Sequence, residues 1–326
     1  MSMSPRAVIT GTGSYLPREI LTNADLEKMV DTSDDWIVQR TGIRERRRAA
    51  DDEPTSVMAT NAARRAMEMA GVTSADIDGI IVATTTPDHT FPSVAVMVQA
   101  ALDIKPSVAF DLQAVCSGFV YGLSVGSSMI ATGMAKNILV IGAERFTNML
   151  DWNDRTTCVL FGDGAGAVVL QAMPGNGIIA DRGVLSTHLY ADGRERGILY
   201  ANGGPGTTRT TGVIQMQGKD VFRHAVAHMA DIVNETLAST GLHIDQIDWL
   251  VPHQANERII RSAAERLNVP LARVIMTVDR HGNTSAASIP LALDTAVRDG
   301  RIRPGQLVLF EALGAGLTWG AALVRF

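Results

Sequence analysis

The clearest hydrophobic pattern in the chain occurs twice, about 170 residues apart. Residues 55–70 and 219–239 each show the apolar spacing of an amphipathic helix, and each leads into an apolar run typical of a buried strand. In both copies a glycine precedes an Ile-Asp pair at the same spacing, Gly71 before Ile77 and Gly241 before Ile247. The pattern predicts a duplicated unit.

Two further apolar segments extend the repeat. Residues 138–144 match 307–312, and residues 166–170 match 320–324 at a shorter offset. Strands and helices alternate within each copy, so we expect two similar mixed α/β units packed together, related by a pseudo-twofold axis. They meet near residues 172–177, which predicts a first half over 1–174 and a second over 175–326.

Composition narrows the classes of function. The chain has 326 residues, 46% of them hydrophobic and 19% charged, a length that suits two domains better than one core. The net charge of −5 argues against a nucleic-acid binder. Two cysteines, Cys116 and Cys158, are too few for a disulfide framework and indicate a reducing compartment. No signal core or membrane span is recognisable, so we expect a soluble cytoplasmic protein.

Three distant segments carry residues that suit one chemistry. Cys116 precedes a helix-like run over 117–132, and a helix N-terminus favours the thiolate. His253 directly follows the duplicated strand. Asn283 lies on the turn that corresponds, by the repeat, to the turn of Cys116. The repeat therefore predicts a site between the halves, with one side chain from the first half and two from the second.

These segments resemble the thiolase superfamily, and most closely the β-ketoacyl-acyl-carrier-protein synthase III family. The resemblance covers nearly the whole chain and includes residues 11–17, 36–46 and 161–166. It implies a duplicated αβαβα layered fold of the α/β class. It also implies decarboxylative Claisen condensation of a short acyl-CoA primer, expected to be acetyl-CoA, with malonyl-acyl carrier protein. The acyl group would pass through an acyl-cysteine, without cofactor or metal, in a homodimer.

The resemblance also assigns residues. Cys116 would be the nucleophile, and His253 and Asn283 would donate hydrogen bonds to the enolate oxygen as carbon dioxide leaves. Backbone amides of Cys116 and Ala315 would form a second oxyanion hole. CoA would lie along Trp36, Arg40, Thr41, Arg155, Gly218, Phe222, Ala255 and Asn256, with its purine between Trp36 and Arg155. Carrier-protein docking would use Gln254, Ala255, Asn256, Glu257, Arg258 and Arg223.

The acyl pocket is where the chain departs from its relatives. Phe91, inserted by a partner subunit, would close the pocket floor. Leu313 stands where the family usually has Phe, and Ala315 and Leu317 replace members of its glycine-rich pattern. A backbone donor survives these changes, and we expect a pocket for short primers.

Other residues have plainer interpretations. Cys158 is expected to be a buried small apolar residue. Residues Arg44 to Arg48 are expected to form a solvated face, and residues 162–166 a packing turn that opens a strand. His281 would support the turn of Asn283. The remaining histidines are expected to be surface or structural groups: His89, His188, His224, His228 and His243.

Three rival functions use the same residues. A papain-like hydrolase would need the histidine to deprotonate the thiol and the asparagine to orient the histidine. A binding scaffold without activity would not need all three residues. A CoA-primed ketoacyl synthase of a secondary pathway shares the chemistry and differs in its product.

Overall fold

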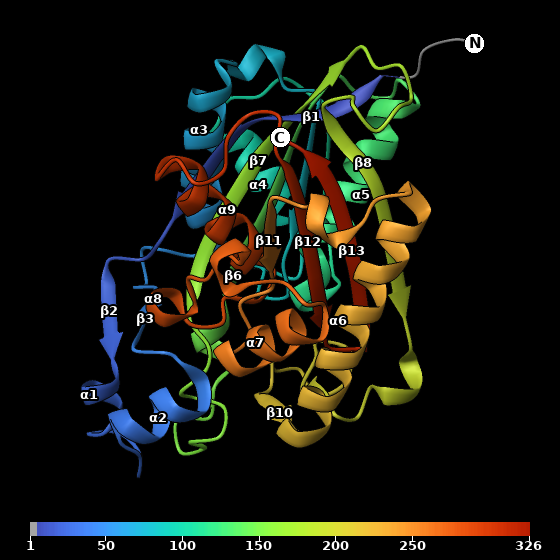
Figure 1. Cartoon of the computed structure of the whole chain (residues 1–326). Helices are drawn as coiled ribbons and strands as arrows, with labels where there is room; N and C mark the ends of the chain where they lie inside the picture. The colour runs from blue at the N-terminus through green and yellow to red at the C-terminus, as the bar shows by residue number, and fades with distance from the viewer. Residues whose placement is uncertain (1–4) are drawn as a thin grey trace.

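The computed structural model describes residues 5–326, in which two mixed β-sheets pack face to face with helices between and outside them (Figure 1). The first sheet has five strands in the spatial order β1-β7-β6-β4-β5. Strands β4, β5 and β6 are mutually parallel, and β7 is antiparallel to both β6 and β1. Their bounds are β1 Arg6–Tyr15, β4 Gly79–Ala83, β5 Val108–Leu112, β6 Asn137–Arg145 and β7 Asp163–Met173.

The second sheet repeats this pattern. Its order is β11-β12-β13-β8, with β11 parallel to β12 and the other neighbours antiparallel. A parallel bridge between Leu250 and Val274 takes the place that β5 has in the first sheet. The predicted duplication is therefore confirmed in strand order and direction. The bounds are β8 Gly183–Ala191, β11 Trp249–Pro252, β12 Leu307–Gly314 and β13 Thr318–Arg325.

Helices complete five layers. Helices α3 and α4 cover the outer face of the first sheet, α6 and α7 cover that of the second, and α5 and α9 lie between the sheets. The predicted amphipathic helices over 55–70 and 219–239 are α3 and α6. The bounds are α3 Thr55–Ala70, α4 Val94–Ala101, α5 Gly118–Ala131, α6 Gly218–Thr240, α7 Glu257–Arg266 and α9 Ser288–Arg298.

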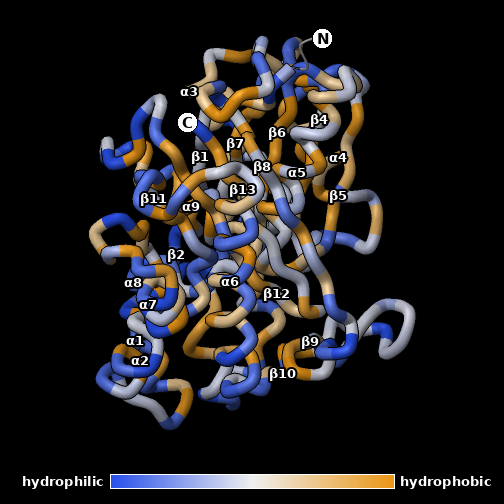
Figure 2. The backbone as a smooth tube through the Cα atoms, turned by 45° about the vertical axis from the view of Figure 1, so that its right-hand side comes forward, coloured by the Kyte–Doolittle hydropathy of each residue, from blue (hydrophilic) through white to orange (hydrophobic). Residues whose placement is uncertain are grey.

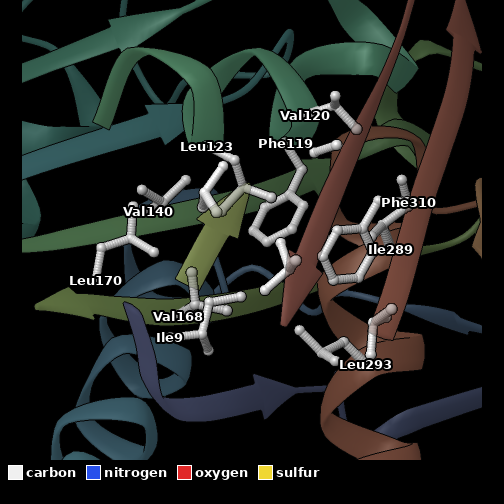
Figure 3. Close-up of a cluster of buried hydrophobic side chains, with 14 of the residues drawn as sticks. Ile9, Phe119, Val120, Leu123, Val140, Val168, Leu170, Ile289, Leu293 and Phe310 are labelled. Atoms are coloured by element: carbon white, nitrogen blue, oxygen red, sulfur yellow. The ribbon is translucent and has the colours of Figure 1, made fainter. Parts of the chain in front are cut away.

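The hydrophobic core is shared by the two halves. Apolar residues concentrate in the central strands and the helices between them (Figure 2). Figure 3 shows Phe119 of α5 beside Phe310 of β12. The two rings pack edge to face, with 6.2 Å between their centroids. Ile289 and Leu293 of α9 join the same cluster. Neither sheet has a separate core on its inner face, so the halves pack as one body; the boundary at 174/175 stays a prediction.

Smaller elements gather at one end of the molecule. They include the hairpin of β2 and β3 and the short helix α2, which lie low in Figure 1 together with α7. The bounds are β2 Glu19–Thr22, α1 Asn23–Leu26, α2 Asp34–Thr41, β3 Glu45–Arg48, β9 Leu199–Ala201, β10 Ile214–Met216 and α8 Val278–His281.

The structure corrects one prediction in this region. Arg44 is exposed, but Arg46 is completely buried, so the basic run is not a solvated face throughout. The Arg46 guanidinium donates hydrogen bonds to the carbonyl of Leu21, the side chain of Asn23 and the carbonyl of Val159. It joins three segments far apart in sequence. The Gly162–Gly166 segment opens strand β7, as predicted.

Candidate active site

Cys116 lies on a tight turn between β5 and α5. Residues Val115–Ser117 form a short 3-10 helix (η2), and α5 begins at Gly118. Val115 has a φ of 48, an uncommon conformation for a β-branched residue. Ser285 has a φ of 51 at the start of the 3-10 helix Ser285–Ala287 (η7), which precedes α9. The two turns therefore share a strained backbone, which confirms their predicted correspondence.

The loop after β12 closes on the nucleophile turn. A Cβ atom at Gly314 would lie 2.8 Å from the amide nitrogen of Cys116, so only glycine allows this approach. The Thr318 hydroxyl donates to the carbonyl of Ala114 at 2.9 Å and is 3.2 Å from that of Ala315. These contacts place Ala315 beside the turn of Cys116. Its role in an oxyanion hole stays a prediction.

Hydrogen bonds fix both the backbone and the ring of His253. Its amide donates to the carbonyl of Glu311 at 2.8 Å, and its Nδ1 is 2.6 Å from Oγ of Ser288. The same Oγ accepts a hydrogen bond from the amide of Gln254. We assign the Ser288 proton to the bond with Nδ1, which leaves the His253 proton on Nε2. Burial lowers the pKa of His253 to about 3, so the imidazole is a neutral donor.

Asn283 is fixed by three hydrogen bonds. Its amide nitrogen donates to the carbonyl of Leu160, and its own carbonyl accepts from Gly162. Its side-chain Oδ1 accepts from the amide of Ser285 at 2.9 Å. Because the side-chain oxygen is engaged, the NH₂ group is the one left to donate to a substrate.

One cavity of about 570 Å³ brings the predicted residues together. Cys116, His253 and Asn283 all line it, although they come from η2, the end of β11 and the turn before η7. Seven of the eight predicted CoA residues and one of the two predicted acyl-pocket residues also line it: Trp36, Arg40, Thr41, Gly218, Phe222, Ala255, Asn256 and Leu313.

The eighth CoA residue, Arg155, does not line the cavity but contacts Trp36, which does. The guanidinium of Arg155 lies 5.2 Å from the centre of the Trp36 ring, and that of Arg40 lies 4.8 Å from it. Arg155 also donates to the carbonyl of Asp31. A purine between Trp36 and Arg155 would have to separate two groups that are now in contact.

The sequence missed part of the cavity wall. Met229 and Ala225 contribute to it from α6, and Met216, Leu199 and Thr156 from other segments. The spacing of Val221, Ala225 and Met229 is the apolar periodicity of α6, but periodicity does not tell a core-facing position from a cavity-facing one.

The predicted docking stretch is only partly accessible. Gln254 is buried, donates to the carbonyls of Pro252 and Ile275, and accepts from the amides of Thr277 and Val278. It is a structural residue, and its assignment to docking is wrong.

The rest of the stretch organises the start of α7 and the surface beside it. Asn256 caps the helix by accepting from the amide of Arg258, and Glu257 pairs with Arg261. Arg258 is exposed and lies over the ring of Phe222, and exposed Arg223 pairs with Asp220.

Phe91 and Leu313 do not line the same cavity within one chain. Leu313 is buried at the cavity, whereas Phe91 is 83% exposed and does not line it. Phe91 can therefore close the pocket only if a second copy presents it, as the resemblance implies.

The remaining histidines and Cys158 have structural positions. Cys158 is completely buried in an apolar cluster, as predicted. His224, His228 and Trp319 form a stack, and His188 pairs with Glu235. His89 and His243 are exposed, and His281 is buried with its pKa lowered to about 4, mainly by burial.

The protonation of Cys116 differs from the expectation. A helix N-terminus predicts a lowered pKa, but burial raises the pKa of this thiol to about 12. The Ser285 hydroxyl opposes this shift, and the nearby Glu144 carboxylate adds to it. The thiol therefore carries its proton at neutral pH and must lose it to react.

Comparisons with known proteins agree with this geometry. Residues 110–193 match the family described as 3-Oxoacyl-[acyl-carrier-protein (ACP)] synthase III, and residues 237–326 match its C-terminal family. A β-ketoacyl-[acyl-carrier-protein] synthase III of Rhizorhabdus wittichii is 60% identical over 98% of this chain and 99% of the relative. The crystal structure of the 3-oxoacyl-[acyl-carrier-protein] synthase III of Aquifex aeolicus superposes with a TM-score of 0.93 at 47% identity, covering 98% and 100% of the two chains.

A priming β-ketosynthase of the R1128 polyketide pathway is also similar, with a TM-score of 0.92 and 36% identity over 99% of this chain and 97% of its own. The fold and the cavity are thus those of a thiolase-like condensing enzyme. The chain belongs to the β-ketoacyl-acyl-carrier-protein synthase III family. It is an acyltransferase that condenses an acyl primer with malonyl-acyl carrier protein at the start of fatty acid synthesis.

Proposed function

We propose that Cys116 carries the acyl primer as a thioester and that His253 and Asn283 stabilise the enolate formed from malonyl-acyl carrier protein. The observation that supports this most directly is that all three line one cavity. The thiol is the one nucleophile among them that can form a thioester. The imidazole and the side-chain amide are neutral hydrogen-bond donors, which suits an oxygen that gains negative charge.

The reaction has two stages in this cavity. In the first, the sulfur of Cys116 attacks the primer thioester, the leaving thiol departs, and the acyl group stays on the enzyme. The amides of Cys116 and Ala315 serve the tetrahedral oxyanion. In the second, malonyl loses carbon dioxide, and the enolate oxygen is held by Nε2 of His253 and the NH₂ of Asn283. The enolate carbon then attacks the carbonyl carbon of the acyl-cysteine, and the bond between that carbon and the Cys116 sulfur breaks, which releases the 3-oxoacyl product and frees Cys116. These groups supply the chemistry without a cofactor or a metal.

The primer is an acyl-CoA in this proposal, with acetyl-CoA as the expected one. The aromatic ring of Trp36 and the cations of Arg40 and Arg155 that contact it suit a purine and phosphates. The exposed Arg258 suits an acidic carrier protein on a chain of net charge −5. We place the reaction in the cytoplasm, where free thiols such as Cys116 and Cys158 persist.

The papain-like alternative is disfavoured by two hydrogen bonds. In such an enzyme the asparagine orients the histidine, but here Nδ1 of His253 contacts Ser288, and Oδ1 of Asn283 accepts from Ser285. The secondary-pathway alternative is disfavoured by the higher identity to the Rhizorhabdus wittichii relative, 60% against 36% for the polyketide enzyme.

A homodimer is part of the proposal. Strand β5 lies at the edge of the first sheet, and Val108 on it is 40% exposed. An apolar edge strand is a surface for pairing with another chain, and Phe91 lies on the connection between β4 and α4, a helix that packs on β5. A second copy would cover both features.

Within residues 5–326, no helix combines the length and the apolar character that a membrane span requires.

Intact-protein mass spectrometry after incubation with acetyl-CoA tests the nucleophile. Wild-type protein should gain one acetyl group, and Cys116→Ala should gain none. Cys158→Ala is the matched control and should be acetylated like the wild type, because Cys158 lies outside the cavity. An acetyl group that persists on Cys116→Ala would contradict the assignment.

A further inference from the structure

A buried acid, Glu144, lies on strand β6, close enough to Cys116 to raise the pKa of its thiol. Glu144 is completely buried. Its carboxylate accepts hydrogen bonds from the amide and hydroxyl of Thr85 and from the hydroxyl of Thr86, at 2.7 to 3.1 Å. These three hydrogen bonds hold the carboxylate, and within residues 5–326 Glu144 forms no ion pair. Burying a carboxylate without a counter-charge costs free energy, and such groups are concentrated at functional sites.

Ser285 lies between this carboxylate and the catalytic thiol. Its hydroxyl is near enough to both groups to lower the pKa of each. The hydroxyl is nevertheless buried without a partner at regular hydrogen-bond geometry in the described chain. The amide of Ser285 is bonded to Asn283, so the backbone that carries the hydroxyl is fixed. A buried hydroxyl between two acidic groups, with no settled partner, is placed to exchange its proton.

The packing leaves little freedom to this arrangement. A Cβ atom at Gly142 would lie 2.1 Å from the carbonyl oxygen of Ala286, so η7 is seated directly on β6. A Cβ atom at Gly118 would lie 3.3 Å from that of Ala286, so α5 also begins against η7. Glu144, Ser285 and Cys116 thus come from three elements that are in contact.

We propose that Ser285 and Glu144 form a proton relay that deprotonates Cys116 during acylation. The proposal rests on Cys116 being the nucleophile. In this relay Ser285 would take the proton from the reacting sulfur, and Glu144 acts through Ser285.

The step balances as follows. As the sulfur of Cys116 forms a bond to the primer carbonyl carbon, the thiol proton moves to Oγ of Ser285, and the proton of that hydroxyl moves to the Glu144 carboxylate. When the tetrahedral intermediate collapses, the bond between carbon and the CoA sulfur breaks. The CoA thiolate takes the proton back along the same path and leaves as a thiol. The carboxylate is restored, and no other acid or base is consumed.

Protonation supports Glu144 over His253 as the acceptor. Burial raises the pKa of Glu144 to about 7 and lowers that of His253 to about 3, so the carboxylate is the stronger base. Few other charges face Glu144. Strand β4 has no titratable residue, and β7 places Gly164 opposite Glu144. Asp163 instead accepts from Ala49 and Thr147, and Cys116 is the titratable group that faces Glu144 from η2.

Single-turnover acylation by acetyl-CoA, followed by mass spectrometry between about pH 5.5 and 9, tests the relay. The wild-type rate should rise with pH through about 7, as Glu144 loses its proton, and then level off. Glu144→Gln should be slower by about 100-fold or more at pH 8 and should lack this inflection. Ser285→Ala should behave alike, and Glu144→Asp should recover part of the rate together with the inflection.

The matched control is Glu311→Gln. Glu311 is also completely buried with a raised pKa, about 8, but it is on β12, so its variant should keep the inflection near pH 7. CoA binding, followed by the change in intrinsic tryptophan fluorescence, checks that each variant is folded. A Glu144→Gln enzyme that acylates as fast as the wild type, or faster because a like charge is gone, would overturn the relay. An acetyl group that peptide mapping places on another residue would instead overturn the nucleophile assignment.

Discussion

Loss of water sets the protonation of the groups in the cavity. Burial moves the pKa of Cys116 up and that of His253 down, so both groups are neutral near pH 7. A neutral imidazole held at Nδ1 by Ser288 can donate from Nε2, which is what an enolate oxygen requires. The same imidazole is a poor base for the thiol. In our proposal, deprotonation of the thiol and stabilisation of the enolate therefore fall to different residues.

This division predicts unequal effects of substitution. His253→Ala or Asn283→Ala should slow decarboxylation of malonyl-acyl carrier protein by about 100- to 1000-fold, because each removes one donor to the enolate. Acetylation of Cys116 should be affected much less. Carbon dioxide release and mass spectrometry measure the two stages separately. If Asn283→Ala slowed both stages equally, a role in orienting His253 would be favoured.

At this scale the sequence predicted which residues meet, and not their state. The types and order of Cys116, His253 and Asn283 were enough to place them in one site. Whether a side chain is buried depends on segments far away, which is why Gln254 was assigned to a surface and Cys116 to a lowered pKa. Glu144 had no local signal at all, because its partners come from residues 84–86 and 285.

Among the elements, local periodicity was a good guide to regular helices and a poor one to connections. The patterns over 55–70 and 219–239 became α3 and α6 with nearly the predicted bounds. The hairpin of β2 and β3 was missed as a structural unit, because its basic residues match a solvated surface. Its position is decided by Arg46, whose three acceptors belong to residues 21, 23 and 159.

Arg46→Ala should therefore lower the free energy of unfolding by about 3 kcal/mol or more, since it leaves several buried acceptors without a donor. Arg48→Ala is the matched control on the same strand. Arg48 pairs with Glu19 at the surface and should cost less than about 1 kcal/mol. Urea denaturation measures both. Equal losses for the two variants would mean that the Arg46 hydrogen bonds contribute little.

The whole molecule should show a pH-dependent stability to which Glu311 contributes. Burial raises its pKa from 4.5 to about 8, and both side-chain oxygens lack a partner in the described chain. Between these values the folded state holds a proton that the unfolded state has lost. Stability from this group is thus full below pH 4.5 and is lost as pH rises through 8.

Glu311→Gln removes this titration. The difference in unfolding free energy between variant and wild type should shift in favour of the variant from about pH 5 to about pH 8, by a few kcal/mol. Chemical denaturation at both pH values gives the result. A difference that does not change with pH would show that the carboxyl of Glu311 is not dehydrated.

In our proposal, the preference for a primer length is set by the assembled dimer. If the partner's copy of residue 91 closes the pocket floor, Phe91→Ala should shift the preference toward longer acyl-CoA, by about 1–3 kcal/mol in kcat/KM for one or two methylenes. The measurement is kcat/KM over a series of acyl-CoA primers. Leu313→Phe is the matched variant at the other wall and should disfavour longer primers. An unchanged profile in Phe91→Ala would exclude a role of Phe91 in pocket depth.

The core shared by α5, α9 and the inner faces of both sheets also limits how far the sequences of the two halves of the chain can diverge. A change of volume at Phe119 in the first half must be accommodated by Phe310 in the second, because their rings are in contact. The outer helices α3 and α6 cover different sheets and do not constrain each other's side chains. The sequences of the two halves should therefore diverge most in their outer layers, while the inner layers accept substitutions only in compensating pairs drawn from both halves.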